Sequence, residues 1–216
     1  MTFRKGKVII DTNLLMQALD YRKYNVFDWI DQVYENIYVH IEVINEFKIE
    51  SERKSILRVI HDRGWRLFDH NDEKFLPNEH RSLYWSYYEE VRLGFEKLKA
   101  KKEAQGRVPK TSNNIGEIHC IALARLISGN IISSNDYEIR EVIEDEKIRV
   151  YSAVLDEDIP IEQDTIEDFC VYCVQARVAK PSSVVKFFKV CHSGDSVQKL
   201  NDKVAVLRKR LNELLE

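Results

Sequence analysis

Glycine, proline and cysteine are all scarce in this 216-residue sequence, which contains seven, four and four of them respectively. So few glycines and prolines exclude a collagen-like chain and a low-complexity linker. The cysteines are also too few, and too embedded in apolar segments, for the disulfide framework of a small secreted domain. We therefore interpret them as buried thiols of an ordinary globular protein.

Long apolar runs are absent as well. No segment approaches the ~20 apolar residues that span a bilayer, and the first residues lack the pattern of a signal peptide, so we expect a cytoplasmic protein without membrane association. Charge of one sign does not dominate, because 33 basic residues face 36 acidic ones for a net charge of −3. A function in nucleic-acid binding would therefore depend on a local basic patch.

Short apolar segments alternate with amphipathic helical patterns over the first two thirds of the chain. We predict strands at 7–10, 37–39, 65–68, 130–133 and 148–152, and helices that include 43–61, 115–127 and 137–145. This alternation is typical of an α/β fold with a roughly five-stranded, mostly parallel sheet between helical layers. Ligands of such sheets bind beyond the carboxyl ends of the strands.

Composition suggests two parts. Residues 1–155 form the predicted α/β domain, with a helical insertion at about 77–110. The segment 156–168 holds seven acids and no base, and we interpret it as the boundary of a helical C-terminal extension, residues 156–216. The last helix carries a short heptad-like apolar seam. Packing on its own domain is the default for this seam, and a homodimer or a regulatory partner is the alternative.

Two polar segments directly follow predicted strands. Asp11–Asn13 comes after the strand at 7–10, and Ser134–Asp136 comes after the strand at 130–133. An acid at the end of a buried strand is costly unless it meets a cation or hydrogen-bond donors. These positions are therefore the first candidates for a functional site.

Four acids, among them Asp11 and Asp136, lie in segments that resemble the four motifs of PIN-domain nucleases. The segments occur in the same order as in that family. They are Asp11 in Val8-Ile9-Ile10-Asp11-Thr12-Asn13, Glu46 in Val43-Ile44-Asn45-Glu46-Phe47, Glu117 in Gly116-Glu117-Ile118-His119-Cys120-Ile121-Ala122-Leu123-Ala124, and Asp136 in Ile131-Ile132-Ser133-Ser134-Asn135-Asp136. One such motif is common, whereas four in order on a matching α/β pattern are fairly specific. The third acid of the family is often Asp, and here it is Glu117.

The resemblance implies a PIN-like three-layer fold and metal-dependent cleavage of phosphodiester bonds, usually in RNA. Asp11, Glu46, Glu117 and Asp136 would be the catalytic residues and the ligands of one or two Mg²⁺ or Mn²⁺ ions. Hard cations prefer such oxygen ligands, and they activate water and neutralise phosphate charge. Around the acids, we expect Thr12, Asn13, Ser134 and Asn135 to orient the site or contact phosphate.

Each acid also has an ordinary structural role open to it. Asp11 and Asp136 can cap or favour the helices that follow them. Glu46 can be a solvated acid on a helix surface. Glu117 has the spacing to complete a capping box with Asn114.

A basic cluster ends the predicted helical insertion. It consists of Lys97, Lys99, Lys101, Lys102, Arg107 and Lys110, against the single acid Glu103. Basic side chains bind phosphates, and this cluster leads directly into the helix of Glu117, which favours substrate binding. The alternative is a solvated helix end.

The sequence thus predicts a metal-dependent endoribonuclease acting on single-stranded or structured RNA, as a toxin of a toxin–antitoxin pair or a defence effector. An antitoxin protein is then an expected partner, although the chain is longer than a minimal toxin. Two alternatives stay open. The same site would serve a DNA- or structure-specific nuclease, and a catalytically silent PIN-like binding module would act through its helices.

Overall fold

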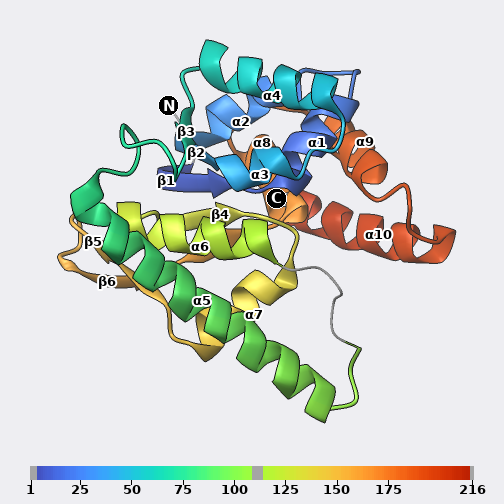
Figure 1. Cartoon of the computed structure of the whole chain (residues 1–216). Helices are drawn as coiled ribbons and strands as arrows, with labels where there is room; N and C mark the ends of the chain where they lie inside the picture. Colours follow the sequence, from blue (N-terminus) through green and yellow to red (C-terminus); the bar gives the residue numbers. More distant parts are fainter. Residues whose placement is uncertain (1–3, 109–113, 215–216) are drawn as a thin grey trace.

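A five-stranded parallel sheet forms the centre of the computed structural model, which describes residues 4–108 and 114–214 (Figure 1). The strand order is β3-β2-β1-β4-β7, and every neighbouring pair is parallel. The strands are β1 (Arg4–Ile10), β2 (Tyr34–His40), β3 (Arg66–Phe68), β4 (Ile131–Ser133) and β7 (Glu162–Asp164). This sheet confirms the predicted α/β class.

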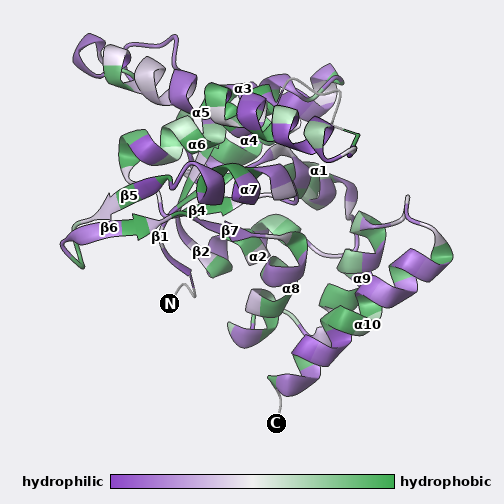
Figure 2. Cartoon of the chain, turned by 90° about the horizontal axis from the view of Figure 1, so that it is seen from below, coloured by the Kyte–Doolittle hydropathy of each residue, from purple (hydrophilic) through white to green (hydrophobic). Residues whose placement is uncertain are grey.

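Helices cover both faces of the sheet and give the fold its three layers. They are α1 (Thr12–Asp20), α2 (Val26–Val33), α3 (Ile41–Asn45), α4 (Glu50–Asp62), α5 (Asn78–Ala104), α6 (Ile115–Ile127), α7 (Tyr137–Asp145), α8 (Ile166–Gln175), α9 (Pro181–Cys191) and α10 (Val197–Glu213). On one face α6 contacts β1, β2 and β4 and is covered by α5; α2 and α8 lie on the other. Figure 2 shows the corresponding gradient, from hydrophobic β4 and α6 to the hydrophilic far end of α5.

The single helix predicted over 43–61 is in fact two. α3 ends at Asn45, and α4 starts at Glu50 after an extended residue, Ile49. The interruption lets Phe47 enter the core with 1% of its surface exposed. Its carbonyl, freed from helical bonding, accepts from the Arg53 guanidinium (3.2 Å). Apolar spacing continues across the break, so periodicity alone predicted one helix.

The fifth strand of the sheet was also predicted wrongly. Residues 149–152 form β5, which pairs antiparallel with β6 (Glu157–Pro160) in a separate two-stranded sheet. The edge position next to β4 belongs to β7, inside the acidic segment that we interpreted as a boundary. A division at residue 155 therefore separates β7 from the other strands of its sheet.

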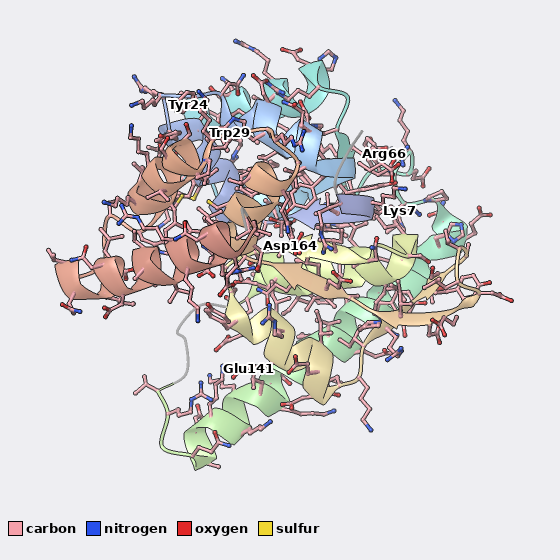
Figure 3. All side chains as sticks on the ribbon, turned by 180° about the vertical axis from the view of Figure 1, so that it is seen from behind. Lys7, Tyr24, Trp29, Arg66, Glu141 and Asp164 are labelled. Atoms are coloured by element: carbon pink, nitrogen blue, oxygen red, sulfur yellow. The ribbon has the colours of Figure 1, made fainter. Side chains whose placement is uncertain are left out.

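An ion pair explains how an acidic segment can enter the sheet. Asp164 is 2% exposed and accepts from the Arg4 guanidinium at both oxygens (2.8 and 3.1 Å). Burial raises the pKa of Asp164, and the Arg4 charge opposes that shift. Figure 3 places Asp164 at the middle of the molecule. The first strand thus supplies the charge that the last strand requires.

The C-terminal helices pack on their own chain, which was the default expectation for the apolar seam. Val204, Leu207 and Leu211 of α10 are buried, and α10 contacts both α8 and α9. At the start of the seam Val197 is 77% exposed. Among the described residues, none of the helices combines the length and the apolar character required of a bilayer span.

We predict that Arg4→Met destabilises the chain by about 3 kcal/mol, because it leaves a buried carboxylate without its cation. The matched control is Glu162→Gln, which removes the exposed second partner of Arg4 (58% exposed) and should cost less than about 1 kcal/mol. Urea unfolding of the three proteins measures the difference. Equal losses in both variants would contradict this role of the Arg4–Asp164 pair.

Candidate metal-binding carboxylate site

The carboxyl ends of β1 and β4 bring Asp11 and Ser134 together. Ile10 and Ser133 are register partners, so the residues after them leave the sheet side by side. The Asp11 amide donates to the Ser133 carbonyl (3.0 Å), and Ser134 Oγ donates to Asp11 Oδ2 (2.7 Å). Asp11 is 3% exposed, and its side chain does not cap α1. Its carboxylate is held at the sheet edge instead.

Asp136 joins this group from the turn after β4. Its amide donates to Ser134 Oγ (3.1 Å), the same hydroxyl that contacts Asp11. Its Oδ1 accepts from the Glu138 amide (2.9 Å) and caps α7, so the ordinary structural role is filled as well. The residue is 7% exposed. Asp136 therefore combines helix capping with a position beside Asp11.

Glu46 reaches the group because α3 stops early. Thr12 Oγ1 donates to Glu46 Oε2, and this bond ties the start of α1 to the end of α3. The other oxygen, Oε1, lies against Gly116 of α6, where a Cβ atom would come within 2.1 Å of it. Glu46 is exposed as a residue, but its carboxylate occupies this space at the start of α6. A side chain at position 116 would displace it.

Glu117 is strongly perturbed. Burial, a hydrogen bond with Asp136 and the charge of Asp11 together raise its pKa to about 8. The alternative role of Glu117, a capping box with Asn114, is not formed through the Asn114 side chain, because the side-chain amide of Asn114 donates to Glu138 Oε2 (3.2 Å). Glu117 and Asp136 thus form a hydrogen-bonded carboxyl pair, which requires that they retain a proton near neutral pH.

Asp11 is the common neighbour of the other three acids. Its charge raises the pKa of both Glu46 and Glu117, and the charge of Asp136 raises that of Asp11. In all three shifts burial is the largest cause. The main groups that shift these acids include no lysine or arginine of the described residues. The four predicted acids are thus gathered, and for Asp11, Glu46 and Glu117 the main electrostatic influences are burial and other acids.

The spacing of the acids bears on what they can hold. In the described part of the chain, the one group of three or more candidate ligand atoms that all lie within 4.8 Å of one another is formed by histidines, so no three of the carboxylates are as close together as that. A small hard cation such as Mg²⁺ usually keeps several waters and binds few carboxylates directly. A wider arrangement of oxygens is therefore compatible with such an ion.

The residues predicted to support the acids divide into two groups. Ser134 contacts Asp11 as described, Asn13 Nδ2 donates to Asp11 Oδ2 (3.2 Å), and Thr12 contacts Glu46. Asn135 faces elsewhere, since its Oδ1 accepts from the Ile166 amide at the start of α8 (2.8 Å). Three of the four thus orient carboxylates, and Asn135 orients the chain after β7.

Gln163 was missed. Its Nε2 donates to the carbonyls of Ser134 and Asp136 (2.9 and 2.7 Å) from β7. It is 8% exposed and fixes the turn that carries Asp136. A glutamine inside an acidic, boundary-like segment offered no signal for this role.

The predicted basic patch is mostly engaged in ion pairs between α5 and α7. Lys97 pairs with Glu146, Lys101 with Asp145, Lys102 with Glu138 and Glu141, and Arg107 with Glu141. Figure 3 labels Glu141 on α7, beside α5. Lys102 is only 6% exposed, whereas Lys99 is exposed and Lys110 lies outside the described residues. These ion pairs therefore hold α5 and the residues after it against α7. Substrate binding by the cluster stays a prediction, and most of its described basic side chains already have acidic partners.

A cluster of imidazoles also escaped the prediction. His40, His70 and His119 meet beside α3 and α6, although no motif in the sequence pointed to them as a group. A usable signal existed, because His40 ends β2 and His70 follows β3 by two residues. The rule that pointed to Asp11 and Asp136 at strand ends applies equally to them.

Comparisons with known proteins do not assign a family. No family model, curated protein or solved structure matches this chain. The resemblance to PIN-domain nucleases is therefore a prediction from four motifs, and function is argued from the geometry of the acids.

We predict that the metal-free chain loses stability as pH rises from about 5 to about 8 because of Glu117. Its folded-state pKa of about 8 exceeds the ordinary value of 4.5, so within this window the unfolded chain releases a proton that the folded chain keeps. Glu117→Gln should flatten this part of the profile. Urea unfolding in a chelator at several pH values measures it.

The matched control is Glu144→Gln, which neutralises an exposed acid on α7. It should preserve the wild-type slope between these pH values. If Glu117→Gln and Glu144→Gln both follow the wild-type profile, Glu117 does not carry the shift.

Proposed function

We propose that this chain is a metal-dependent nuclease that hydrolyses phosphodiester bonds of RNA. The observation that carries the proposal is the gathering of Asp11, Glu46, Glu117 and Asp136 from four separate segments, with Asp11 as the neighbour of the other three. Buried like charges are unfavourable unless a cation or protons offset them. A divalent cation at this edge of the sheet is the ligand that best satisfies them.

The donor set fits Mg²⁺ or Mn²⁺, because the four side chains offer carboxylate oxygens only. Asp11, Glu117 and Asp136 would hold the ion, and Glu46 approaches from the space that Gly116 leaves beside α6. Such an ion, when bound, neutralises charge on the phosphate and lowers the pKa of a water molecule. One ion or two are both compatible with four acids.

The chain's own residues have distinct tasks in this proposal. Ser134 and Asn13 fix the orientation of the Asp11 carboxylate through its Oδ2. Glu117 has a pKa of about 8 without metal, so it would release its proton when it ligates the ion, and binding should tighten as pH rises toward 8. Thr12 keeps Glu46 turned toward the site.

An exposed aromatic residue next to Asp136 in the sequence supports nucleic acid as the substrate class. Tyr137 directly follows Asp136 at the start of α7 and is 67% exposed. A ring in solvent is available to stack on an unpaired base, which is how single strands are commonly bound. The proposal extends, on the motif resemblance alone, to a cytoplasmic toxin or defence effector with an antitoxin partner or a homodimer.

We predict Mg²⁺- or Mn²⁺-dependent cleavage of RNA that Asp11→Asn lowers on the order of 100-fold or more, since a neutral amide cannot replace a charged ligand. The assay compares single-stranded RNA, single-stranded DNA and a flapped duplex. The matched control is Asp20→Asn, an exposed acid at the other end of α1, which should cleave like the wild type.

Preference among the three substrates separates an RNA nuclease from a DNA- or structure-specific one. If the wild type cleaves none of them with either ion, or Asp11→Asn cleaves as fast as the wild type, the nuclease proposal is wrong. The silent binding module would then be the better description.

We predict that Tyr137→Ala raises KM for single-stranded RNA by roughly 5- to 100-fold and leaves kcat little changed, because stacking aids binding before and during reaction equally. Steady-state kinetics measure both constants. Tyr151→Ala is the control, since that ring is 50% exposed but lies on β5. A change in kcat alone, or equal effects of both variants, would exclude the stacking role.

A further inference from the structure

We propose that His40, His70 and His119 form a second metal site, which takes an imidazole-binding transition ion such as Zn²⁺. These three residues, the histidine cluster, come from the end of β2, the segment after β3 and the first half of α6. One ring nitrogen of each lies within 4.8 Å of those of the other two. The inference does not rest on the proposed nuclease function, because the ligands and the chemistry are different.

Burial sets this cluster apart from the other histidines. His40, His119 and His70 are 0%, 4% and 9% exposed. The chain has six histidines, so half of them meet at one buried point. Imidazoles carry no net charge in their neutral form, and three of them in contact can share a cation without a carboxylate.

Hydrogen bonds show which ring nitrogens of His40 and His119 already have partners. His40 Nδ1 accepts from the Glu42 amide (3.0 Å), so its Nε2 carries the ring proton and donates to the Tyr84 hydroxyl (2.8 Å). The same hydroxyl contacts His119 Nδ1 (2.6 Å). Tyr84 Oη thus lies between one nitrogen of His40 and one of His119. An ion bound there would take the place of this hydroxyl, and His40 would give up its Nε2 proton and its hydrogen bond from the Glu42 amide.

His70 supplies the observation that points to a ligand. Its Nδ1 is buried and has no hydrogen-bond partner in the described structure, while Nε2 contacts Asn71 Nδ2 (3.2 Å). A buried ring nitrogen without a partner is unfavourable. A purely structural cluster leaves this nitrogen unexplained, whereas metal ligation gives the ring a role.

The dimensions are near those of a metal site. Three atoms within 4.8 Å of one another lie no more than about 2.8 Å from a common centre, against Zn–N bonds of ~2.0–2.1 Å. The rings are stacked at interplanar angles of 15°, 18° and 24°, so they must tilt for their lone pairs to converge. Tyr84 Oη is the nearest fourth donor.

Ligand chemistry separates this site from the carboxylates. Nitrogen ligands select Zn²⁺ and its neighbours among the later transition metals, whereas Mg²⁺ prefers oxygen. Aromatic rings surround the cluster, with Trp85 against His70, Tyr88 against His119 and Phe68 against His40. Their apolar surfaces limit access of water, which strengthens ligation.

The position of the cluster indicates what the ion does. His40 immediately precedes α3, which leads to Glu46, and His119 follows Glu117 by two residues on α6. An ion shared by the histidine cluster would hold α3 against α6, which are already in contact. Its role is therefore to fix the helices that carry two of the four acids.

The test uses the full chain without a histidine tag, stripped of metal with a chelator and then titrated with Co²⁺ and Zn²⁺. We expect one equivalent of Co²⁺ to give the visible absorption of a nitrogen-ligated ion, and Zn²⁺ to displace it. His70→Gln should weaken binding at least 10-fold, because it removes one of three ligands. Circular dichroism checks that the variant is folded.

Two controls locate the ion. His80→Gln removes a histidine whose side chain is 55% exposed, and Asp11→Asn alters the carboxylates; both should retain the Co²⁺ spectrum. The proposal is overturned if the wild type binds neither ion stoichiometrically, or if Asp11→Asn abolishes binding while His70→Gln preserves it. Neither outcome depends on cleavage of RNA, so the failure of one proposal leaves the other intact.

Discussion

The hydrogen bond from Ser134 Oγ to Asp11 Oδ2 joins the ends of two neighbouring parallel strands, and the arrangement of the acids depends on it. The strands β1 and β4 end in register, so the residues that follow them lie side by side at the carboxyl ends of the strands. Ser134 also accepts from the Asp136 amide, and through it the fourth acid is held beside the first. Glu46 and Glu117 then approach from helices that pack at the same edge.

The sheet edge divides into two chemical halves. Moving along the strand order, β3 and β2 lead to His70 and His40, whereas β1 and β4 lead to Asp11 and Asp136. Helix α6 lies beside both halves and contributes Glu117 to one and His119 to the other. Carboxylate oxygens and imidazole nitrogens are thus separated along one edge, as the two proposed sites for different classes of cation require.

Much of this arrangement could be predicted because local patterns are strong at β1 and β4. Each is an apolar strand that ends in an acid-containing polar triplet, and the chain cannot bury such acids without a reason. The sheet class followed from the alternation of elements. The structure also brings the four predicted acids together, although their chemical roles stay predictions.

Other features depend on contacts that spacing does not encode. The break between α3 and α4 accompanies the burial of Phe47 in the core, while apolar periodicity continues through it. The strand β7 looked like a solvated acidic boundary because its counterion, Arg4, lies 160 residues away. Similarly, Lys101 and Lys102 of α5 form ion pairs with acids of α7, which lie some 40 residues later in the sequence.

The gathering of Asp11, Glu46, Glu117 and Asp136 from four segments is the central physical feature, and a cation held by them should be visible directly. Crystals grown with Mn²⁺ would give anomalous difference density at any bound ion. A peak bounded by Asp11, Glu117 and Asp136 is the expected result. If well-ordered carboxylates were seen with no peak among them, a divalent cation would not be what gathers these acids.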